Sequence, residues 1–283
     1  MLTLEQEGNQ RVLREGDQCI FLRDFDDCRK HYSGNLFLLA SGRSAAAFPV
    51  AKYAAFPFIA MNGSILRLVQ EGIEPLFYMC DDSSFVAARP DFAALGAKHA
   101  RHLAMNLECL QALHEFDPGI LSGKRVYLLE RVNRYYGKNP LSDRRFAWSI
   151  RKDSDLISGF SLFRQKTNRI GFSRNLQKGY FGSRTIVYGA TQLAYHLGFP
   201  KVFIIGMDLR ASMGRFYEQK QGALPTSLDM DFNNFILPSF RLMAKKIIAQ
   251  EDFRVFNLSP ESRLPTSILP KINLEQLHQF IAP

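Results

Sequence analysis

The strongest chemical signal in the sequence is a cluster of charged and hydroxyl side chains that follows the apolar segment 201–205. It contains two carboxylates, two arginines and a tyrosine: Asp208, Arg210, Arg215, Tyr217 and Glu218. Carboxylates accept hydrogen bonds from sugar hydroxyls, and arginine and tyrosine donate to phosphate oxygens. Glu218 or Asp208 could also act as a general base. The pattern favours a sugar-phosphate site, and a surface ion pair of Glu218 with Arg210 or Arg215 is the alternative.

Two shorter motifs follow other apolar runs. Ser41-Gly42-Arg43-Ser44 comes after residues 35–40, and Asn62-Gly63-Ser64 comes after residues 58–61. A glycine- and serine-containing turn can present backbone N–H groups to a phosphate. Asn62 could bind a base or a ribose. An ordinary strand-to-helix turn and a helix cap remain the alternatives for these two motifs.

Signatures of several other enzyme classes are missing. The sequence has no Walker loop, no Gly-x-Gly-x-x-Gly after its first expected strand, no Gly-x-Ser-x-Gly and no His-Glu-x-x-His. The six histidines show no metal-ligand spacing. Asp229-Met230-Asp231 has the spacing of a metal motif, but it stands in a polar stretch before an expected helix. We expect neither a metal ion nor a cofactor.

The elements that must position these residues form an alternating pattern. Six short apolar runs end in small or polar residues: 35–40, 58–61, 75–80, 125–129, 201–205 and 254–256. Helical patterns are found at 64–71, 92–113, 183–197, 233–250 and 274–281. Such alternation predicts an α/β, Rossmann-like fold with a mostly parallel sheet flanked by helices. Ligands bind at the carboxyl ends of such strands, where the motifs stand.

The clearest unit is the helix expected at 183–197. Ser183 is a plausible N-cap, and Gly198 is well placed to stop the helix. Residues 1–33 are polar and weakly patterned, which favours an edge element at the N-terminus.

Composition indicates an ordinary globular protein. The chain has 283 residues, 46% of them hydrophobic, which suits a single α/β domain over 1–283. The four scattered cysteines read as reduced thiols, and no signal peptide is visible at the N-terminus. The most apolar stretch, 45–61, is too short and interrupted to span a bilayer. We therefore expect a cytoplasmic protein.

The positive charge is concentrated in one segment. Residues 131–178 hold 12 of the 36 Lys and Arg and only 3 of the 27 Asp and Glu, so this segment accounts for the whole net charge of +9. We interpret it as a basic lid or subdomain that suits a polyanionic partner. A solvated basic surface is the alternative.

The run GYFGSRTIVYGATQLAYHLGFPKVFIIGMDLRASMGRFYE at 179–218, with later Leu224-Pro225 and Phe256-Asn257-Leu258-Ser259, resembles the lipopolysaccharide-core proteins described as Kdo transferase III. The resemblance covers most of the chain after about Asn35. It implies transfer of Kdo, an acidic eight-carbon sugar, or a related ulosonic acid from its CMP ester to the inner core of lipopolysaccharide. The implied partners are the CMP-sugar, the lipid A-core acceptor and the anionic inner-membrane surface, with no nucleic acid.

The same segment is more distantly similar to bacterial CMP-sialic-acid-dependent sialyltransferases. That likeness implies nucleotide contacts from Ser41, Gly42 and Asn62, a helix-start threonine at Thr185, and the Gly-x-Asp of Gly206 and Asp208. It also implies inversion at the anomeric carbon. With the motifs above, the expected substrate-binding residues are Ser41, Gly42, Asn62, Gly63, Ser64, Asp81, Ser183, Thr185, Gly206, Arg210, Arg215 and Tyr217.

Two departures from the sialyltransferase pattern affect the mechanism. The tyrosines that hold the leaving phosphate fall on Arg210 and Phe216, so Arg210, Arg215 and Tyr217 would replace them. No histidine occurs between His196 and His278, so the catalytic histidine has no counterpart. Glu218 is the first choice for the base and Asp208 the second.

Two other function classes stay open. A pyrophosphokinase on a related scaffold would need Mg²⁺, and Asp81 and Asp82 after residues 75–80 keep it possible. A non-catalytic protein that binds anionic lipid or nucleic acid through 131–178 would also fit the charge. Peripheral association with the inner membrane is expected, and a homo-oligomer is compatible with the sequence.

Overall fold

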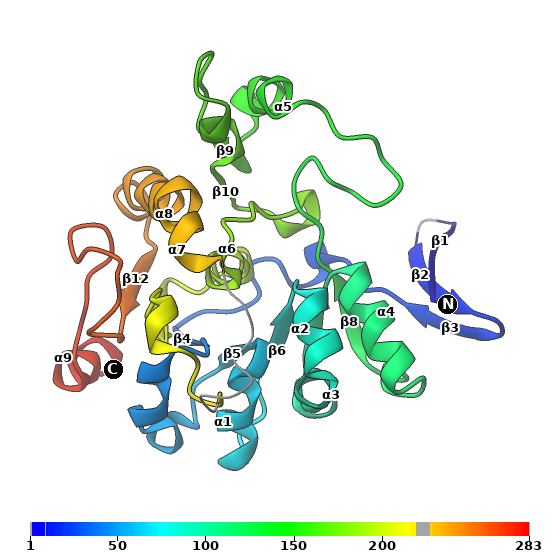
Figure 1. Cartoon of the computed structure of the whole chain (residues 1–283), viewed down its shortest axis with the longest axis horizontal. Coiled ribbons are helices and arrows are strands. Elements are labelled where there is room, and N and C mark those ends of the chain that lie inside the picture. The colour runs from blue at the N-terminus through cyan, green and yellow to red at the C-terminus, as the bar shows by residue number, and fades with distance from the viewer. Residues whose placement is uncertain (1, 9, 219–226, 283) are drawn as a thin grey trace.

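A seven-stranded parallel sheet forms the centre of the molecule (Figure 1). The computed structural model describes residues 2–8, 10–218 and 227–282. The strands run in the order β12-β11-β4-β5-β6-β7-β8. Their bounds are β4 (Asn35–Leu39), β5 (Phe58–Met61), β6 (Phe77–Cys80), β7 (His102–Met105), β8 (Arg125–Leu128), β11 (Lys201–Ile205) and β12 (Arg254–Asn257). The α/β, Rossmann-like expectation is confirmed.

The strand order reverses direction between β4 and β11. From β4 the chain adds β5 to β8 on one side, and it then returns to place β11 and β12 on the other. Ligands of open α/β sheets bind at such a switch point, outside the carboxyl ends of the strands. The turns that follow β4 and β11 therefore stand at the position where this fold class builds its sites.

Helices cover both faces of the sheet, because alternate side chains of each buried strand point to opposite faces. Leu36 and Leu38 of β4 belong to one hydrophobic cluster, and Phe37 and Leu39 belong to the other. The first cluster includes α6 (Ile186–Leu197) and α8 (Leu237–Met243). The second includes α1 (Ile65–Gln70), α2 (Ser83–Ala88), α3 (Pro90–His99), α4 (Leu107–Phe116) and α9 (Leu274–Ile281).

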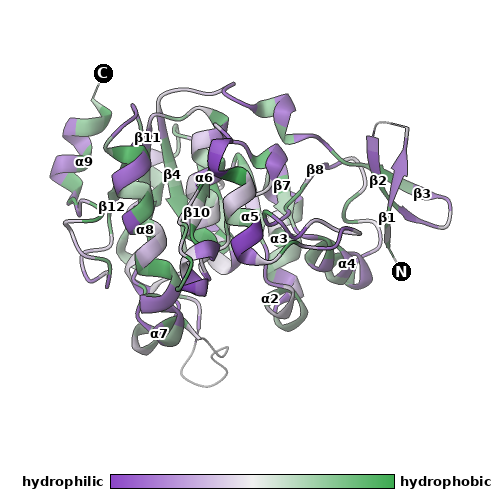
Figure 2. Ribbon diagram, turned by 90° about the horizontal axis from the view of Figure 1, so that it is seen from above, coloured by the Kyte–Doolittle hydropathy of each residue, from purple (hydrophilic) through white to green (hydrophobic). Residues whose placement is uncertain are grey.

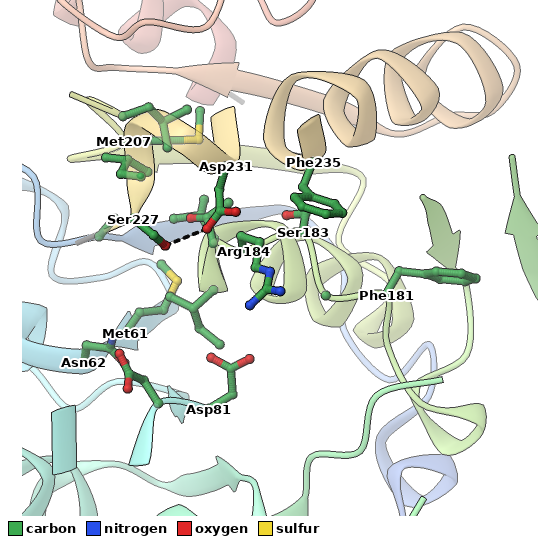
Figure 3. Close-up of a pocket in the computed structure, with 18 of the residues that line it drawn as sticks. Met61, Asn62, Asp81, Phe181, Ser183, Arg184, Met207, Ser227, Asp231 and Phe235 are labelled. Carbon is green, nitrogen blue, oxygen red and sulfur yellow. Dashed lines mark hydrogen bonds between the residues drawn. The ribbon is translucent and has the colours of Figure 1, made fainter. Parts of the chain in front are cut away.

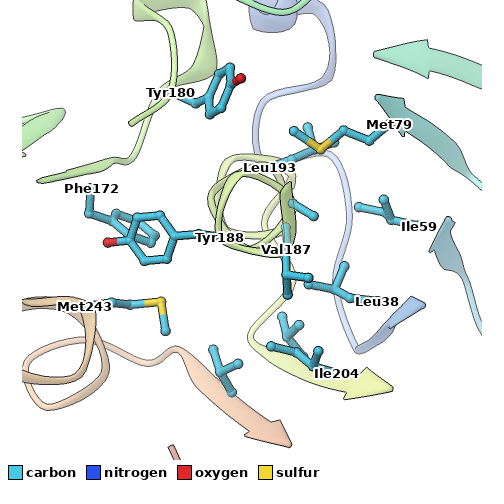
Figure 4. Close-up of a cluster of buried hydrophobic side chains, with 14 of the residues drawn as sticks. Leu38, Ile59, Met79, Phe172, Tyr180, Val187, Tyr188, Leu193, Ile204 and Met243 are labelled. Carbon is cyan, nitrogen blue, oxygen red and sulfur yellow. The ribbon is translucent and has the colours of Figure 1, made fainter. Parts of the chain in front are cut away.

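Helix α6 is the centre of the first cluster. Figure 4 shows Val187 of this helix beside Leu38 and Ile204 of the sheet, with Tyr188 turned toward Phe172 and Met243. In Figure 2 the neighbouring strands β4 and β11 are green, as expected for a sheet buried on both faces. The helix ends at Gly198, whose φ of 101° is left-handed, so the predicted stop signal is confirmed.

The structure differs from three sequence-based expectations about elements. The helix expected at 92–113 is two helices, α3 and α4, with β7 between them, since a short and mostly apolar run fits a helical stripe as well as a strand. The described residues of 1–33 reach the edge of the large sheet only through an isolated bridge of Arg23 with Tyr127 in β8. They contain a separate three-stranded antiparallel sheet of β1 (Thr3–Glu7), β2 (Gln10–Glu15) and β3 (Gln18–Phe21).

The third difference concerns helix starts. Helix α6 begins at Ile186 with Thr185 at its N-cap position, so Ser183 is not the cap. The helix expected at 233–250 begins earlier, with α7 (Leu228–Asp231), and continues into α8. Helix ends are the least certain part of a sequence-based assignment, because capping depends on the direction in which the chain enters.

The segment 131–178 projects from the large sheet (Figure 1). It contains α5 (Asp143–Ser149) and a two-stranded antiparallel sheet of β9 (Leu156–Ser158) and β10 (Gly171–Ser173). Across the described part of the chain, no helix is long and apolar enough to cross a membrane.

Candidate active site

A cavity of about 970 Å³ lies at the carboxyl ends of the central strands (Figure 3). Its wall is formed by the turns after β4, β5, β6 and β11, the start of α6, and part of the segment 131–178. Most of the predicted site residues line it: Ser41, Gly42, Asn62, Asp81, Ser183, Thr185, Gly206, Asp208, Arg210, Arg215 and Glu218. Gly63, Ser64 and Tyr217 are not among the residues that line it.

The turns after β4 and β11 are in direct backbone contact. The Gly42 N–H donates to the Gly206 carbonyl at 2.9 Å. A Cβ added to Gly42 would lie 2.3 Å from that oxygen, and Gly206 itself has a φ of +76°. Both positions therefore need glycine, one for close approach and one for a left-handed backbone.

Asp208 fixes the shape of this region. Its side chain is buried, and its Oδ2 accepts from the Ser44 backbone N–H at 2.9 Å. Its Oδ1 accepts from the Ser44 hydroxyl, which also lies 3.0 Å from the Ser259 hydroxyl. Both carboxylate oxygens are thus engaged with the turn after β4. The geometry gives Asp208 a positioning role.

Glu218 and Arg215 form an ion pair within the cavity wall. The Arg215 guanidinium contacts Glu218 Oε1, and the Arg215 backbone N–H donates to Oε2 at 3.0 Å. The Glu218 side chain is only 8% exposed, so the pair differs from the open surface pair that the sequence left as an alternative. The Phe216 N–H donates to the Ser41 carbonyl at 3.1 Å, which holds this loop against the turn after β4.

Three predicted residues support the site from behind its wall. Ser64 is buried, accepts from the Met61 N–H at 2.8 Å and donates to the Leu39 carbonyl, so it ties β5 to β4. The Tyr217 ring covers Gly63, where a Cβ would lie 2.2 Å from the ring. Burial raises the pKa of Tyr217. The structure brings these three residues to the framework of the site and not to its surface.

Two polar side chains at the cavity have no protein partner. Asn62 Oδ1 and the buried Ser183 hydroxyl make no hydrogen bond within the described residues. Asn62 therefore does not cap the helix that follows it. Buried polar atoms are normally satisfied, so unpaired ones at a cavity wall suit a ligand. This geometry favours the ligand-binding interpretation of Asn62.

The N-terminus of α6 opens into the cavity. Thr185 occupies the N-cap position without a side-chain capping bond, and both Thr185 and Ile186 line the cavity. The first N–H groups of a helix have no partner within it and carry a partial positive charge. This helix end is a suitable place for an anion.

Arg184 precedes this helix end, and sequence reasoning missed it. Its exposed guanidinium points into the cavity (Figure 3). No ion pair joins it to a carboxylate of the described residues, and its guanidinium carbon lies 5.6 Å from the centre of the Phe235 ring. The position of Arg184 directly before an expected helix, within the segment 179–218, could have identified it as a candidate site residue.

Backbone strain gathers around the cavity. Among the described residues, five other than glycine have positive φ values, and four of them line the cavity: Asn62, Asn133, Arg184 and Leu209. A left-handed backbone is costly for such residues and persists where the surroundings impose it, often at functional sites. No sequence pattern signals this for Arg184 or Leu209.

Acidic side chains occupy the opposite side of the cavity. Asp81 Oδ2 accepts from the Tyr180 hydroxyl and, at 3.0 Å, from Arg131. Burial and the Asp81 charge raise the pKa of Tyr180, which keeps this phenol a proton donor. Asp82 instead caps α2 through the Phe85 N–H. The two carboxylates of the pyrophosphokinase alternative are therefore already engaged by protein groups.

Asp231 is a carboxylate that the sequence analysis set aside. It lines the cavity from α7 and accepts from the Ser227 hydroxyl at 2.6 Å (Figure 3). Within residues 2–8, 10–218 and 227–282, no group of three or more His, Cys, Asp or Glu side chains could hold a metal ion.

Known proteins similar to this chain share one description. Two relatives named "Probable 3-deoxy-manno-octulosonic acid transferase" match, one from Escherichia coli K12 and one from Salmonella typhimurium LT2. The first is 24% identical over 87% of this chain and 84% of its own length. The second is 26% identical over 93% of both chains.

Two solved structures are also similar. The MAf glycosyltransferase from Magnetospirillum magneticum AMB-1 matches with a TM-score of 0.45 and 15% identity, over 88% of this chain and 35% of the other. A tyrosine-to-phenylalanine variant of the sialyltransferase CST-II, solved in complex with CMP, matches with a TM-score of 0.43 and 13% identity. That match covers 83% of this chain and 84% of the other.

The family comparison covers most of the sequence. A family model described as 3-deoxy-D-manno-octulosonic acid transferase WaaZ matches residues 23–275. That span includes the whole large sheet, α6 and every described residue of the cavity wall. The chain is therefore a glycosyltransferase that belongs to the WaaZ family of 3-deoxy-D-manno-octulosonic acid transferases.

Proposed function

We propose that this protein transfers Kdo, or a related ulosonic acid, from its CMP ester to a hydroxyl of the lipopolysaccharide inner core. The names of the relatives and of the family support the transferred sugar. The observation that carries the proposal for the donor is the α6 N-terminus with Arg184, since it opens into the same cavity as the Ser41-Gly42 turn. A nucleotide sugar with a phosphate and a carboxylate matches this arrangement of donors.

The donor would lie across the switch point of the sheet. Ser41, Gly42 and Asn62 would contact the nucleotide, and the unpaired Asn62 Oδ1 supplies an acceptor for a base or ribose donor. The α6 N-terminus and Arg184 would hold the phosphate or the sugar carboxylate. Preorganised donors of this kind also stabilise the negative charge that develops on a departing phosphate. Arg210, which already donates to the Glu261 carbonyl at 2.8 Å, would add to them.

The reaction needs one proton acceptor. A base would take the proton of the acceptor hydroxyl while the hydroxyl oxygen forms a bond to the anomeric carbon of the donor sugar. The bond from that carbon to the phosphate oxygen breaks, and CMP leaves with the electron pair. We propose Glu218 as the base, metal-independent transfer and inversion. Asp231 is the competing carboxylate, because a single serine hydroxyl is its only side-chain partner among the described residues.

Binding of CMP tests the proposal most directly. CMP should raise the melting temperature of the purified protein in the presence of EDTA, by about 4 to 5 °C at a concentration near 100 times Kd. ATP with Mg²⁺ should have no comparable effect. Stabilisation by ATP–Mg²⁺ and none by CMP would favour the pyrophosphokinase alternative. Mass spectrometry of lipopolysaccharide core from cells with and without the gene should then show the loss of one Kdo mass.

Matched isosteric variants identify the base. Glu218→Gln should lower kcat about 100-fold or more, the usual contribution of a general base, while the Kd for CMP changes less than about threefold. Asp231→Asn is the control, and it should keep most of the activity. If Asp231→Asn lost its activity and Glu218→Gln kept it, Asp231 would be the base. Full activity in both variants would remove carboxylate base catalysis from the proposal.

A further inference from the structure

The projecting segment 131–178 carries large apolar side chains that nothing covers. Phe163 is 93% exposed, and Leu162, Trp148 and Phe160 are 57%, 53% and 43% exposed. The Trp148 and Phe160 rings lie 5.4 Å apart, and Leu162 and Phe163 follow Phe160 within three positions of the chain. We call Trp148, Phe160, Leu162 and Phe163 the apolar tip. Single exposed apolar residues are common, but a group of four on a projection indicates an interaction surface.

Positive charge surrounds the apolar tip. Exposed basic residues flank it in sequence on both sides: Arg144, Arg145, Arg151, Lys152 and Arg164. The Arg151 guanidinium lies 4.1 Å from the centre of the Trp148 ring. The turn Gln165–Arg169 packs against α5, which brings the two basic stretches together.

The carboxylates of this segment do not neutralise that charge. Asp143 pairs with Arg169, Asp153 with Lys178, and Asp155 with Arg29 and Lys178. No ion pair in the described part of the chain links a carboxylate to the five basic residues around the tip. The surface therefore presents apolar side chains within a positively charged rim.

We propose that the apolar tip and its basic rim dock this protein onto an anionic lipid bilayer. Aromatic and aliphatic side chains insert at the interface between head groups and acyl chains, and Lys or Arg beside them meet the phosphates. Each basic residue near an anionic membrane strengthens the binding about fivefold. The tip projects from the protein surface, so its side chains can insert among lipid acyl chains more readily than into the surface of a folded protein.

The proposal deepens the proposed function and rests on it only for its biological purpose. Phe146, Asn168 and Arg169 belong to the same segment and line the cavity. Docking by the tip would bring the cavity to the membrane that holds a lipid-linked acceptor. Binding to vesicles requires neither donor nor acceptor, so a failure of docking and a failure of sugar transfer are distinguishable.

Trp148 is the single tryptophan of the chain, so tryptophan fluorescence, excited beyond the absorption of the tyrosines, reports on the tip alone. With vesicles of phosphatidylcholine and phosphatidylglycerol, the Trp148 emission should shift to shorter wavelength, and lipids brominated on the acyl chain should quench it. Vesicles of phosphatidylcholine alone should give neither effect. An unchanged emission with both kinds of vesicle would overturn the proposal.

Variants assign the binding to the tip and its rim. Leu162→Ala with Phe163→Ala, and separately Arg144→Glu with Arg145→Glu, should each weaken binding to anionic vesicles about tenfold or more. CMP-induced stabilisation should be retained, which shows that the variants are folded. Phe116→Ala on α4, and Lys52→Glu with Lys98→Glu, change exposed residues outside the segment 131–178, and these variants should bind as the unmodified protein does.

Two further outcomes would contradict membrane docking. Equal binding by the tip variants and the unmodified protein would place the contact elsewhere. A concentration-dependent blue shift without vesicles, with a dimer in analytical ultracentrifugation, would mean that the tip pairs with a second copy of the chain.

Discussion

Gly42 stands where the proposed nucleotide would bind, and a single added carbon atom would disturb the backbone there. A Cβ at this position would lie 2.3 Å from the Gly206 carbonyl oxygen and 2.7 Å from Asp208 Oδ2. The first of these is backbone of a strand end, which cannot move without breaking the contact between the turns after β4 and β11. We predict that Gly42→Ala weakens CMP binding about tenfold or more and lowers the melting temperature, because the strain falls on the site itself.

Calorimetric titration with CMP and a thermal unfolding curve measure both effects. Gly119→Ala is the matched control, since the nearest atom to its added Cβ is Asp117 Oδ1 at 3.7 Å. That variant should bind CMP with unchanged affinity. An undiminished CMP affinity in Gly42→Ala would separate this turn from the donor site.

Site residues could be predicted from the sequence where their role depends on neighbouring residues in the chain. Asp208 was identifiable because it follows an apolar run at an expected strand end, and Gly206 was identifiable through the sialyltransferase resemblance. Arg184 and Asp231 were not, because a charged residue acquires its meaning from the cavity it faces. The interpretation of Asp208 also changed, since its two hydrogen bonds to Ser44 connect residues 164 positions apart. No sequence spacing predicts such a contact.

At the scale of elements, β7 was hidden by its own composition. The four residues His102–Met105 are all buried, and they follow an amphipathic helix without a glycine or proline between them. Only the parallel register with β6 and β8 makes this segment a strand. Helix α6 was predictable because its apolar stripe and its glycine stop agree. The sequence pattern was sufficient to predict α6, but for β7 it fitted a helix as well as a strand.

The start of β7 also gives the protein a pH-dependent stability. His102 is buried against the Phe77 and Tyr127 rings, and burial together with the charges of Arg125 and Arg101 lowers its pKa to about 4. An unfolded histidine has a pKa of about 6.5, so between these values the unfolded chain binds a proton that the folded chain does not. The contribution of His102 to the free energy of unfolding should be constant well above pH 6.5 and fall by about 2 to 3 kcal/mol as the pH decreases to 4.

Urea unfolding at pH 7 and pH 4.5 measures this dependence. Burial lowers the pKa of His196 as well, so His102→Gln should lose only part of the dependence. His31→Gln, at an exposed position, should keep all of it. A His102→Gln variant with the full dependence of the unmodified protein would show that this imidazole is not the group responsible.

At the scale of the whole molecule, two regions with different electrostatics match the two proposed substrates. The residues proposed to bind the donor stand at the switch point between β4 and β11, inside a cavity with charged groups on both sides. The basic residues around the apolar tip stand on a projection in open solvent. Salt screens exposed charges over about 8 to 10 Å at physiological ionic strength and affects buried ones much less. The same change of salt should therefore act unequally on donor and acceptor.

We predict that raising NaCl from about 50 to 500 mM increases the apparent KM for a vesicle-held acceptor about tenfold, because the rim loses its attraction to anionic head groups. The Kd for CMP should change less than about threefold, because its phosphate contacts lie within the cavity. Initial rates with acceptor in phosphatidylglycerol vesicles, and in parallel with a deacylated acceptor in solution, measure the difference. A deacylated acceptor with the same salt dependence would assign the effect to the cavity, and the basic segment would then have no part in acceptor delivery.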